Sequence, residues 1–590
     1  MIIPKSCALA AFFGSFQQEA FVSSMTATRV LVCLLCVVLM SGCTQSLVRS
    51  APAFPVAAKV PLNVRAEAYY QYLAAQQYVN EKQYDKAIEA YRKALQITPG
   101  SPMLQTELAL LYIHQNKLDP ALKLLEDSIR TTPDQPRAYL LLGQLYVAKG
   151  RFDKAEQAYK RAIEINPSAT EAYLLLGVLY AQESRFNKAI QIFDELEKKA
   201  PGNPMPLYYK ARIFLDMRYY GQAERILKQL LAQEPGFEDG MLDLAYIYEV
   251  TDRPQEAEVT YLQILESDPS DTQALTRLGN LYMREGRDDA ALRQFNRLVK
   301  IDPKDVENRL KIGIIHLEQK NFTDAISDFK ALLKVSPKYG QALYYLALAR
   351  ESTLDYRGAI RSLSAIAPTS RMWNAAQARM AMIYLKLKDF DKAAGVLNEA
   401  IARSPAASDL YVYLSLVYEE ANRNEDALKA LDRGLNVLPD NPGLLFRKGV
   451  VLSKMGKDDE AVETMRKILA VEPENADALN FIGYSYAVRG IHLLEAKELI
   501  LRALSASPDD GYIMDSLGWV YFKMGERRKA LDTLLEAVKR VPNDPVIQEH
   551  LGDVYRKLGQ KAKAGEAYRK AIEFKQSGAE KIRTKLNAIR

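Results

Sequence analysis

The residue types that bind metals or act as nucleophiles are few in this chain and widely separated. Its four histidines are at least 58 residues apart, which excludes two ligands on one helix. Serines and aspartates are plentiful but scattered, and no phosphate loop, nucleophile elbow or dinucleotide fingerprint occurs. We therefore expect no catalytic residues, no metal site and no cofactor. The histidines are His114, His316, His492 and His550.

Charge and cysteine usage restrict the class of partner further. The 79 basic and 73 acidic residues are interspersed, giving a net charge of +6. A nucleic-acid footprint would need basic residues clustered on one face, so we expect neither nucleic acid nor a small-molecule substrate. The four cysteines all lie within the first 43 residues, which excludes disulfides and thiolate metal sites from the rest of the chain. They are Cys7, Cys33, Cys36 and Cys43.

Cys43 lies in a pattern that has a chemistry of its own. Residues 30–40 are 11 consecutive apolar residues preceded by Arg29, a run too short to span a bilayer and typical of a signal-peptide core. The run ends in Ser41-Gly42-Cys43, and small residues ahead of a cysteine resemble the lipobox of bacterial lipoproteins. This resemblance implies that Cys43 is diacylated and becomes the mature N-terminus. Met40 departs from the leucine that the family prefers.

The length of the leader and the residue after the cysteine refine this prediction. Because 42 residues precede the cysteine, more than the roughly 15 to 30 of most leaders, we expect translation to start at Met25. Residues 1–42 are the predicted signal peptide, and a start at Met25 shortens it to 18 residues. Residues 43–67, which contain three prolines and no helical period, are a lipidated N-terminus and flexible tether. Thr44 replaces the aspartate that resembles an inner-membrane retention signal, which predicts an outer-membrane lipoprotein facing the periplasm.

The rest of the chain repeats one alanine at a fixed interval. The interval is 34 residues, with a single interval of 35, and no repeat lacks its alanine. A period of this length predicts stacked units, each of which buries its apolar face against its neighbours. The fifteen alanines are Ala87, Ala121, Ala155, Ala189, Ala223, Ala257, Ala291, Ala325, Ala359, Ala393, Ala427, Ala461, Ala496, Ala530 and Ala564.

Residues 136–169 show what one unit contains. Two apolar stripes at helical spacing flank Lys149-Gly150-Arg151, which predicts an antiparallel helix pair. Gly143 and Ala155 are small because the helices cross there, and Pro167 cannot continue a helix interior. The position of Gly143 holds glycine, alanine or serine in every unit, and thirteen units close with a proline at the position of Pro167.

Small, small, aromatic and proline residues at these offsets in a 34-residue unit resemble the tetratricopeptide repeat (TPR). The resemblance covers residues 68–578. It implies an all-α fold, a right-handed superhelical solenoid of about fifteen 34-residue helix pairs. It also implies a concave groove that binds peptides or protein surfaces, and it implies no reaction.

Two irregularities and a C-terminal segment set the expected domains. In the ninth unit the closing proline comes early, at Pro368, which predicts a loop over residues 368–374. We therefore expect an N-terminal lobe of about nine repeats over 68–373 and a C-terminal lobe of about six over 374–578. One extra residue falls between Tyr486 and Ala496. Residues 579–590 carry a weak apolar stripe, which predicts a helix that caps the solenoid.

The resemblance further implies that the second, fifth, ninth and twelfth to thirteenth positions of each first helix face the groove. These positions are mostly apolar with aromatic residues among them. Basic residues beside an asparagine, as in the clamp that holds a C-terminal carboxylate in some family members, come close only where Arg277 and Arg284 flank Asn280. We therefore expect an apolar segment, extended or helical, or a folded partner to bind through aromatic anchors.

Tyr208, Tyr209 and Arg212 are the strongest local candidates, because tyrosine and arginine are the usual anchors of protein interfaces. For each such residue the alternative is that its side chain only packs between repeats. The remaining groove candidates are Tyr246, Tyr344, Phe446, Tyr484 and Trp519.

The sequence predicts a non-enzymatic, lipid-anchored scaffold that recruits periplasmic or envelope proteins. Some similar lipoproteins act as adaptors for periplasmic proteases, and others serve polysaccharide export or secretion assemblies. The alternative is therefore a structural subunit of such an envelope assembly. A cytoplasmic co-chaperone would require that the leader at residues 1–42 is an artefact.

Overall fold

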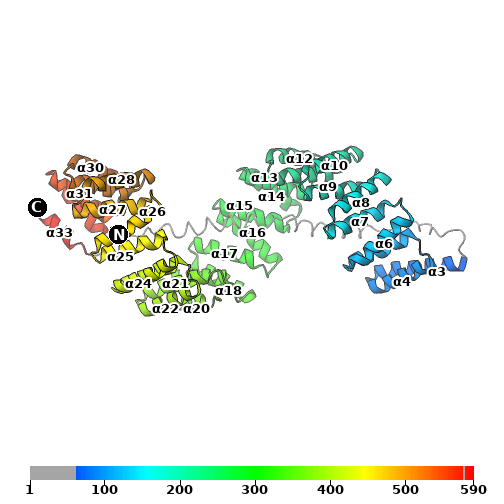
Figure 1. Cartoon of the computed structure of the whole chain (residues 1–590), viewed down its shortest axis with the longest axis horizontal. Coiled ribbons are helices and arrows are strands. Elements are labelled where there is room, and N and C mark those ends of the chain that lie inside the picture. Colours follow the sequence, from blue (N-terminus) through cyan, green and yellow to red (C-terminus); the bar gives the residue numbers. More distant parts are fainter. Residues whose placement is uncertain (1–61, 576–577, 590) are drawn as a thin grey trace. The chain divides into compact units, whose positions relative to one another are not determined.

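The computed structural model of the chain describes residues 62–575 and 578–589. Cys43, the predicted signal peptide and residues 43–61 of the predicted tether lie outside these ranges. Helix α3 begins at Leu62, so residues 62–67, expected in the tether, are helical. The described residues form helices α3 to α33 and no strands (Figure 1). None of these helices is both long and apolar enough to cross a bilayer.

Each repeat begins with one helix of the pair, and most of these first helices have 13 residues because a turn residue ends them at the same position. The first helices are α3 (Leu62–Asn80), α5 (Pro102–His114), α7 (Pro136–Ala148), α9 (Thr170–Gln182), α11 (Met205–Asp216), α13 (Glu238–Val250), α15 (Thr272–Arg284), α17 (Val306–Glu318), α19 (Gly340–Ser352), α21 (Trp373–Lys386), α23 (Ser408–Glu420), α25 (Pro442–Lys454), α27 (Ala476–Arg489), α29 (Gly511–Lys523) and α31 (Pro545–Lys557).

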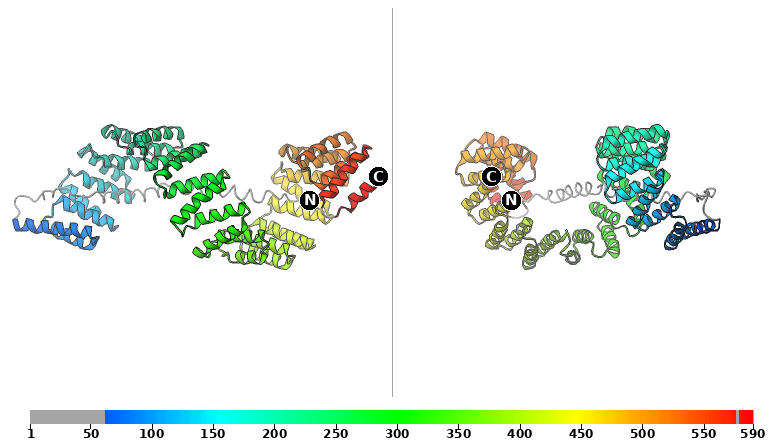
Figure 2. Two further views of the ribbon diagram at one scale, coloured as in Figure 1. Left: turned by 180° about the vertical axis from the view of Figure 1, so that it is seen from behind. Right: turned by 45° about the vertical axis from the view of Figure 1, so that its right-hand side comes forward.

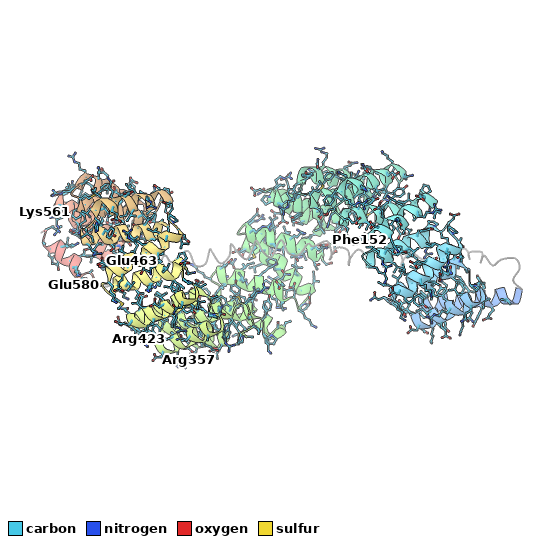
Figure 3. All side chains as sticks on the ribbon, in the orientation of Figure 1. Phe152, Arg357, Arg423, Glu463, Lys561 and Glu580 are labelled. Atoms are coloured by element: carbon cyan, nitrogen blue, oxygen red, sulfur yellow. The ribbon has the colours of Figure 1, made fainter. Side chains whose placement is uncertain are left out.

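The second helix of each pair has 14 residues except for α20, which has nine. In Figure 3 the labelled Phe152 and Lys561 mark the start of α8 and α32. The second helices are α4 (Tyr84–Ile97), α6 (Leu118–Thr131), α8 (Phe152–Ile165), α10 (Phe186–Lys199), α12 (Tyr220–Gln233), α14 (Pro254–Ser267), α16 (Asp288–Ile301), α18 (Phe322–Val335), α20 (Tyr356–Ser364), α22 (Phe390–Arg403), α24 (Asn424–Val437), α26 (Asp458–Val471), α28 (Leu493–Ala506), α30 (Arg527–Arg540) and α32 (Lys561–Phe574).

The repeated alanines lie where the two helices of a pair cross. All fifteen are 0% exposed, as the close approach of two helices requires. Opposite them, a Cβ added to Gly143 would lie 2.2 Å from the ring of Tyr159. A Cβ on Gly483 would lie 2.9 Å from the carbonyl oxygen of Ala496. The crossing therefore leaves no room for a larger residue on either helix, as the sequence predicted.

The turn between the two helices of a pair has one conformation in fourteen of the fifteen repeats, and the thirteenth repeat has a second residue with positive φ. One residue adopts a left-handed conformation, with φ between 58° and 82° at positions such as Asn116, Gly150 and Gly525. The next backbone N–H then donates to a carbonyl in the last turn of the first helix, as from Arg151 to Tyr146 at 2.8 Å. Six of these fifteen turn residues are glycines, which accept positive φ without strain.

The ninth repeat departs from the pattern as the early proline predicted, though with different bounds. Helix α20 ends at Ser364 and α21 begins at Trp373, so the loop covers residues 365–372 and not 368–374. Ile366 and Met372 of this loop are buried, at 1% and 6% exposure, in one hydrophobic cluster with α19, α20 and α21. The core is therefore continuous through this loop.

The extra residue of the thirteenth repeat lengthens its first helix. Helix α27 has 14 residues and ends at Arg489, and both Gly490 and His492 in the following turn have positive φ. At the C-terminus, α33 (Glu580–Asn587) lies within the range predicted for a capping helix. Its Ile582 is fully buried in a cluster with residues of α30, α31 and α32.

The chain divides into two compact units, residues 1–285 and 286–590. Within each unit, successive helix pairs stack on their neighbours, and the views of Figure 2 agree on this order. The division falls in the turn between α15 and α16, inside the seventh repeat. The predicted lobe boundary between residues 373 and 374 lies within the second unit and stays a prediction.

Candidate functional site

First helices of neighbouring repeats pack against each other within each unit, for example α9 with α11 and α23 with α25. Their fifth, sixth, ninth, twelfth and thirteenth residues lie on the side of the helix where these contacts occur. We call this surface the first-helix face. All eleven candidate binding residues lie on it, at the fifth, sixth, ninth or thirteenth position.

Tyr208, Tyr209 and Arg212 lie together on α11 and are half-buried. The ring of Tyr209 stacks on Phe193 with centroids 5.5 Å apart, and the ring of Tyr208 lies 5.2 Å from that of Phe237. Tyr208 and Tyr209 are themselves 5.6 Å apart. These rings are held by their neighbours in fixed positions, which lowers the entropy cost of binding a partner.

The guanidinium of Arg212 faces Asp243 of the next first helix. Nη1 of Arg212 lies 3.5 Å and 3.4 Å from the two carboxylate oxygens, which is long for a charge-assisted hydrogen bond. Burial raises the pKa of the Asp243 carboxyl above its usual range, and the charges of Arg212 and Arg277 oppose this rise. This loosely made pair leaves most of the donors of the guanidinium unused by Asp243.

Three candidates lie on α15. Arg284 forms an ion pair with Glu249 of α13, whose other oxygen accepts a hydrogen bond of 2.5 Å from Tyr261. The guanidinium of Arg277 lies 5.4 Å from the centre of the Tyr246 ring, in a cation–π contact. Asn280 lies between these two arginines in sequence and is half-buried. The basic residues beside Asn280 therefore already have partners within the chain.

In the second unit, Tyr344 and Phe446 are each half-buried beside another aromatic residue. Tyr344 makes an edge contact with Tyr345 at 6.0 Å, and Tyr345 stacks on Phe329. Phe446 of α25 makes an edge contact with Phe481 of α27 at 6.2 Å. Both candidates therefore contribute to packing and keep part of their rings exposed.

Tyr484 and Trp519 meet around a histidine that the sequence did not single out. The ring of His550 stacks on Trp519 at 4.0 Å and lies 6.4 Å from Tyr484. Nδ1 of His550 lies 2.9 Å from the carboxylate of Asp515, and both side chains are nearly buried. Burial, with a smaller effect of Asp515, raises the pKa of Tyr484 to about 12.

The repeat register carries one signal that the predictions from the sequence do not include. The twelfth position of the first helix is glutamate in three repeats, at Glu249, Glu351 and Glu419. In each case the following repeat has arginine at its sixth position and lysine or arginine at its thirteenth. Aligning the repeats position by position would have found this pattern, because no other repeat has arginine at the sixth position.

No metal centre accompanies these residues. Within residues 62–575 and 578–589, no group of three or more histidine, cysteine, aspartate or glutamate side chains is placed to hold a metal ion. The first-helix face thus offers aromatic rings, guanidinium groups and carboxylates. Such a surface is suited to bind a polypeptide by area, aromatic anchors and ion pairs.

Family profiles of the tetratricopeptide repeat match most of the chain. Together with the fifteen stacked helix pairs, this shows the class of protein: an all-α solenoid of TPR units. The chain belongs to the tetratricopeptide-repeat family. The matched residues are 78–145, 145–204, 214–276, 251–306, 310–371, 379–442, 446–511 and 516–579.

Similarity to individual proteins is confined to short stretches or to the fold. A TPR repeat-containing protein of Pseudomonas aeruginosa, PA4667, is 46% identical over 55 residues, which is 9% of each chain. Among solved structures, Naa15/Naa10 bound to HypK-THB matches 88% of this chain at 14% identity, with a TM-score of 0.36. The Cut9-Hcn1 hetero-tetramer of APC/C matches 83% at 16% identity, with a TM-score of 0.34. The match to the P. aeruginosa protein thus spans about a tenth of that relative's length.

Proposed function

We propose that this protein is a non-enzymatic scaffold that binds other proteins through its first-helix face. The observation that carries the proposal is the row of half-buried tyrosine, tryptophan and arginine side chains on that face, of which Tyr208, Tyr209 and Arg212 are the densest group. Such residues dominate the binding energy of protein interfaces, and their neighbours here hold them in place before a partner arrives.

We further propose that the scaffold is anchored to the outer membrane and faces the periplasm. The support is the sequence Ser41-Gly42-Cys43 after an apolar run, with Thr44 in place of aspartate. Two or more acyl chains would hold the protein stably on a bilayer, whereas one chain binds only marginally. Globomycin should leave the precursor unprocessed, and Cys43→Ala should release the protein from the membrane fraction. Unchanged processing and fractionation would contradict the anchor.

Its partners are then periplasmic or envelope proteins, for example a protease that the scaffold brings to a substrate. The alternative is a structural subunit of a polysaccharide-export or secretion assembly. The two differ in stoichiometry and genetic context, because a structural subunit is expected beside the genes of its assembly. Co-purification of a fixed-stoichiometry envelope complex would favour the alternative.

Site-specific photo-crosslinking tests the binding face directly. A photo-reactive phenylalanine at Tyr208 should crosslink a partner in intact cells. The matched control is the same residue at Leu262, which is 46% exposed on the second helix α14 of the same unit. A partner that crosslinks through Leu262 and not through Tyr208 would contradict the proposal.

A further inference from the structure

Three glutamates on the first-helix face have nearly buried side chains. Glu249, Glu351 and Glu419 are 7%, 6% and 7% exposed, although each lies in the last turn of its helix. A buried carboxylate is unfavourable unless cations and hydrogen bonds compensate for the lost water. Each of these glutamates must therefore have partners from a neighbouring element.

The partners come from the first helix of the next repeat. Oε2 of Glu351 accepts from Nε of Arg379 at 2.7 Å, and its Oε1 accepts from Nζ of Lys386 at 2.6 Å. Glu419 repeats the arrangement two repeats later. It pairs with Arg447, and Nζ of Lys454 lies 3.7 Å from its Oε2.

In the first unit, Glu249 is the corresponding carboxylate and pairs with Arg284. At all three junctions the glutamate thus pairs with the cation at the thirteenth position, and at the two junctions of the second unit it also pairs with the arginine at the sixth position. In the sequence, arginine occupies the sixth position only in the three repeats that follow these glutamates. The glutamate and its two cations therefore occur as a set, and a chance surface ion pair would not recur in this way.

In the two sets of the second unit one carboxylate faces two cations, and three of these four cations keep their outer ends in solvent, whereas the side chain of Arg447 is only 17% exposed. The side chains of Arg379, Lys386 and Lys454 are 40%, 52% and 51% exposed. Arginine has five N–H donors and lysine three, and one carboxylate uses only a few of them. Donors and positive charge are left over at the surface of each junction.

The section of the second unit from Glu351 to Lys454 contains two of these sets. On the first-helix face of this section, the four cations exceed the acidic residues, which are the two buried glutamates and the exposed Glu420 at the end of α23. Burial raises the pKa of Tyr344 and the charge of Arg379 opposes this rise, so this aromatic residue interacts electrostatically with one of the cations. The section has the composition of a site for an acidic, partly apolar polypeptide.

We propose that Arg379, Lys386 and Lys454 bind an acidic segment of a partner polypeptide, with Glu351 and Glu419 holding these cations in place. This inference rests on the proposed function and names the chemistry of the partner at one section of the same face. The buried glutamates act as positioning residues. They fix the cations and at the same time reduce the net positive charge that the partner meets.

Because the glutamates both position the cations and reduce their net charge, one substitution can distinguish partner binding from a purely structural role of these ion pairs. If the ion pairs only tie repeats together, Glu351→Gln should weaken the fold and leave the affinity for acidic peptides unchanged or lower. If the cations bind an acidic partner, Glu351→Gln frees their charge and should tighten binding. Glutamine is nearly isosteric with glutamate and keeps an acceptor for Lys386, so the fold is expected to survive.

The experiment uses the full chain without its leader and three fluorescein-labelled peptides of equal length. These alternate alanine with glutamate, glutamine or lysine, and binding is read by fluorescence anisotropy. We expect the glutamate peptide to bind best and to lose affinity as salt rises. Lys386→Gln and Lys454→Gln should each weaken binding about two- to fivefold, as expected for half-exposed charges, and Glu351→Gln should strengthen it by a similar factor.

Lys392→Gln is the matched control, because Lys392 lies on the second helix α22, outside the first-helix face, where it is 65% exposed and forms an ion pair of 2.6 Å with Asp389. Circular dichroism checks that each variant is folded. Equal binding of the glutamate and glutamine peptides would overturn the proposal, as would a folded Glu351→Gln protein without tighter binding. Either result would leave the scaffold function intact if Tyr208 still crosslinks a partner. Loss of that crosslink would count against the function and not against this site.

Discussion

The first-helix faces of repeats 3–4 and of repeats 9–12 are built on the same helix pairs but carry different chemistry. In repeats 3–4 the face is apolar: Leu140 and Leu141 are buried, and Leu174, Leu175 and Val178 are half-buried. In repeats 9–12 it carries the two junction carboxylates with their cations. The alanines at the helix crossings are 0% exposed in both regions. The crossing therefore sets the fold, and the fifth, sixth, ninth, twelfth and thirteenth positions are free to differ.

The largest expected effect tests whether the crossing is equally tight in the two regions. Gly143→Ala should destabilise its repeat by about 1–3 kcal/mol, because the new Cβ would lie 2.2 Å from the rigid ring of Tyr159. Gly449→Ala should cost less, because there the obstacle is the flexible end of Met465, 2.5 Å away. Hydrogen exchange of the affected helices measures each, since a long solenoid need not unfold in one step.

Gly395 provides the control for these substitutions. It lies in α22 with nothing within 4 Å of an added Cβ, so Gly395→Ala should stabilise by about 0.5–1 kcal/mol through helix propensity alone. If Gly143→Ala also proves stabilising, the helices do not cross as closely as described.

The second effect concerns the ion pairs of the buried glutamates on the first-helix face, which repeats 9–12 have and repeats 3–4 lack. Glu351→Ala leaves Arg379 and Lys386 without their buried partner, and we expect a loss of about 1–2 kcal/mol because both cations remain partly solvated. A double-mutant cycle with Lys386→Met measures the pairwise coupling. The destabilisation caused by Glu351→Ala should depend on the salt concentration, because salt screens ion pairs. The destabilisation caused by Leu174→Ala in the apolar region should not. A cycle energy near zero would mean that the pair contributes nothing to stability.

A smaller effect is expected at the turns that both regions share. Leu354 has φ 62° and is 71% exposed, a strained conformation with no compensating contact for an exposed leucine. Leu354→Gly should therefore stabilise the ninth repeat by up to about 1 kcal/mol. The reverse change, Gly456→Leu, should destabilise the twelfth repeat by a similar amount. Thermal melts of the two variants should shift in opposite directions.

The smallest effects come from carboxylates outside both regions, and they have opposite pH dependence. A hydrogen bond with Asp271, with burial adding to it, raises the pKa of the exposed Glu238 to about 7. The folded state then binds a proton more tightly than the unfolded state, so stability falls as pH rises from about 4.5 to about 7. Glu238→Gln should relieve this loss, so its effect on the free energy of unfolding should be more favourable at pH 8 than at pH 5, by less than about 1 kcal/mol after solvent screening. Thermal melts at the two pH values measure this.

The pKa of Glu224 is shifted in the opposite direction, so its effect on stability has the opposite pH dependence. Hydrogen bonds from Arg253 and Lys228 outweigh burial and lower its pKa to about 2. Its stabilising contribution is complete above about pH 4.5 and is lost as pH falls towards 2. Glu224→Gln should therefore lower the melting temperature at pH 7 and make little difference near pH 2. Parallel pH profiles for the two variants would contradict this assignment.

Much of the fold could be read from the sequence because its main determinants are local and periodic. The alanine register gave the number of pairs and the crossing points, and Pro368 indicated where α20 ends early. The predicted bounds of this loop, 368–374, were wrong, because Ile366 and Met372 of the loop at residues 365–372 are held by packing and not by turn residues. Residues 62–67 were expected in the tether, but they form the first part of helix α3.

The candidate site was predictable by position but not by role. The register placed Arg277 and Arg284 on the first-helix face, yet their contacts with Tyr246 and Glu249 depend on side chains from another repeat. The stacking of His550 on Trp519 likewise joins side chains of two different repeats. Such contacts join residues 28 to 35 positions apart, as from Glu351 to Arg379 or Lys386, so reading one repeat alone cannot reveal them.

The most direct test of the scaffold account is hydrogen–deuterium exchange of the full chain with and without the partner that crosslinks through Tyr208. We predict that the partner slows exchange in first helices, with α11 affected more than α12. Side chains of the first-helix face then lose water and mobility. Protection confined to second helices such as α12 and α14, with first helices unchanged, would contradict the central claim that the first-helix face binds proteins.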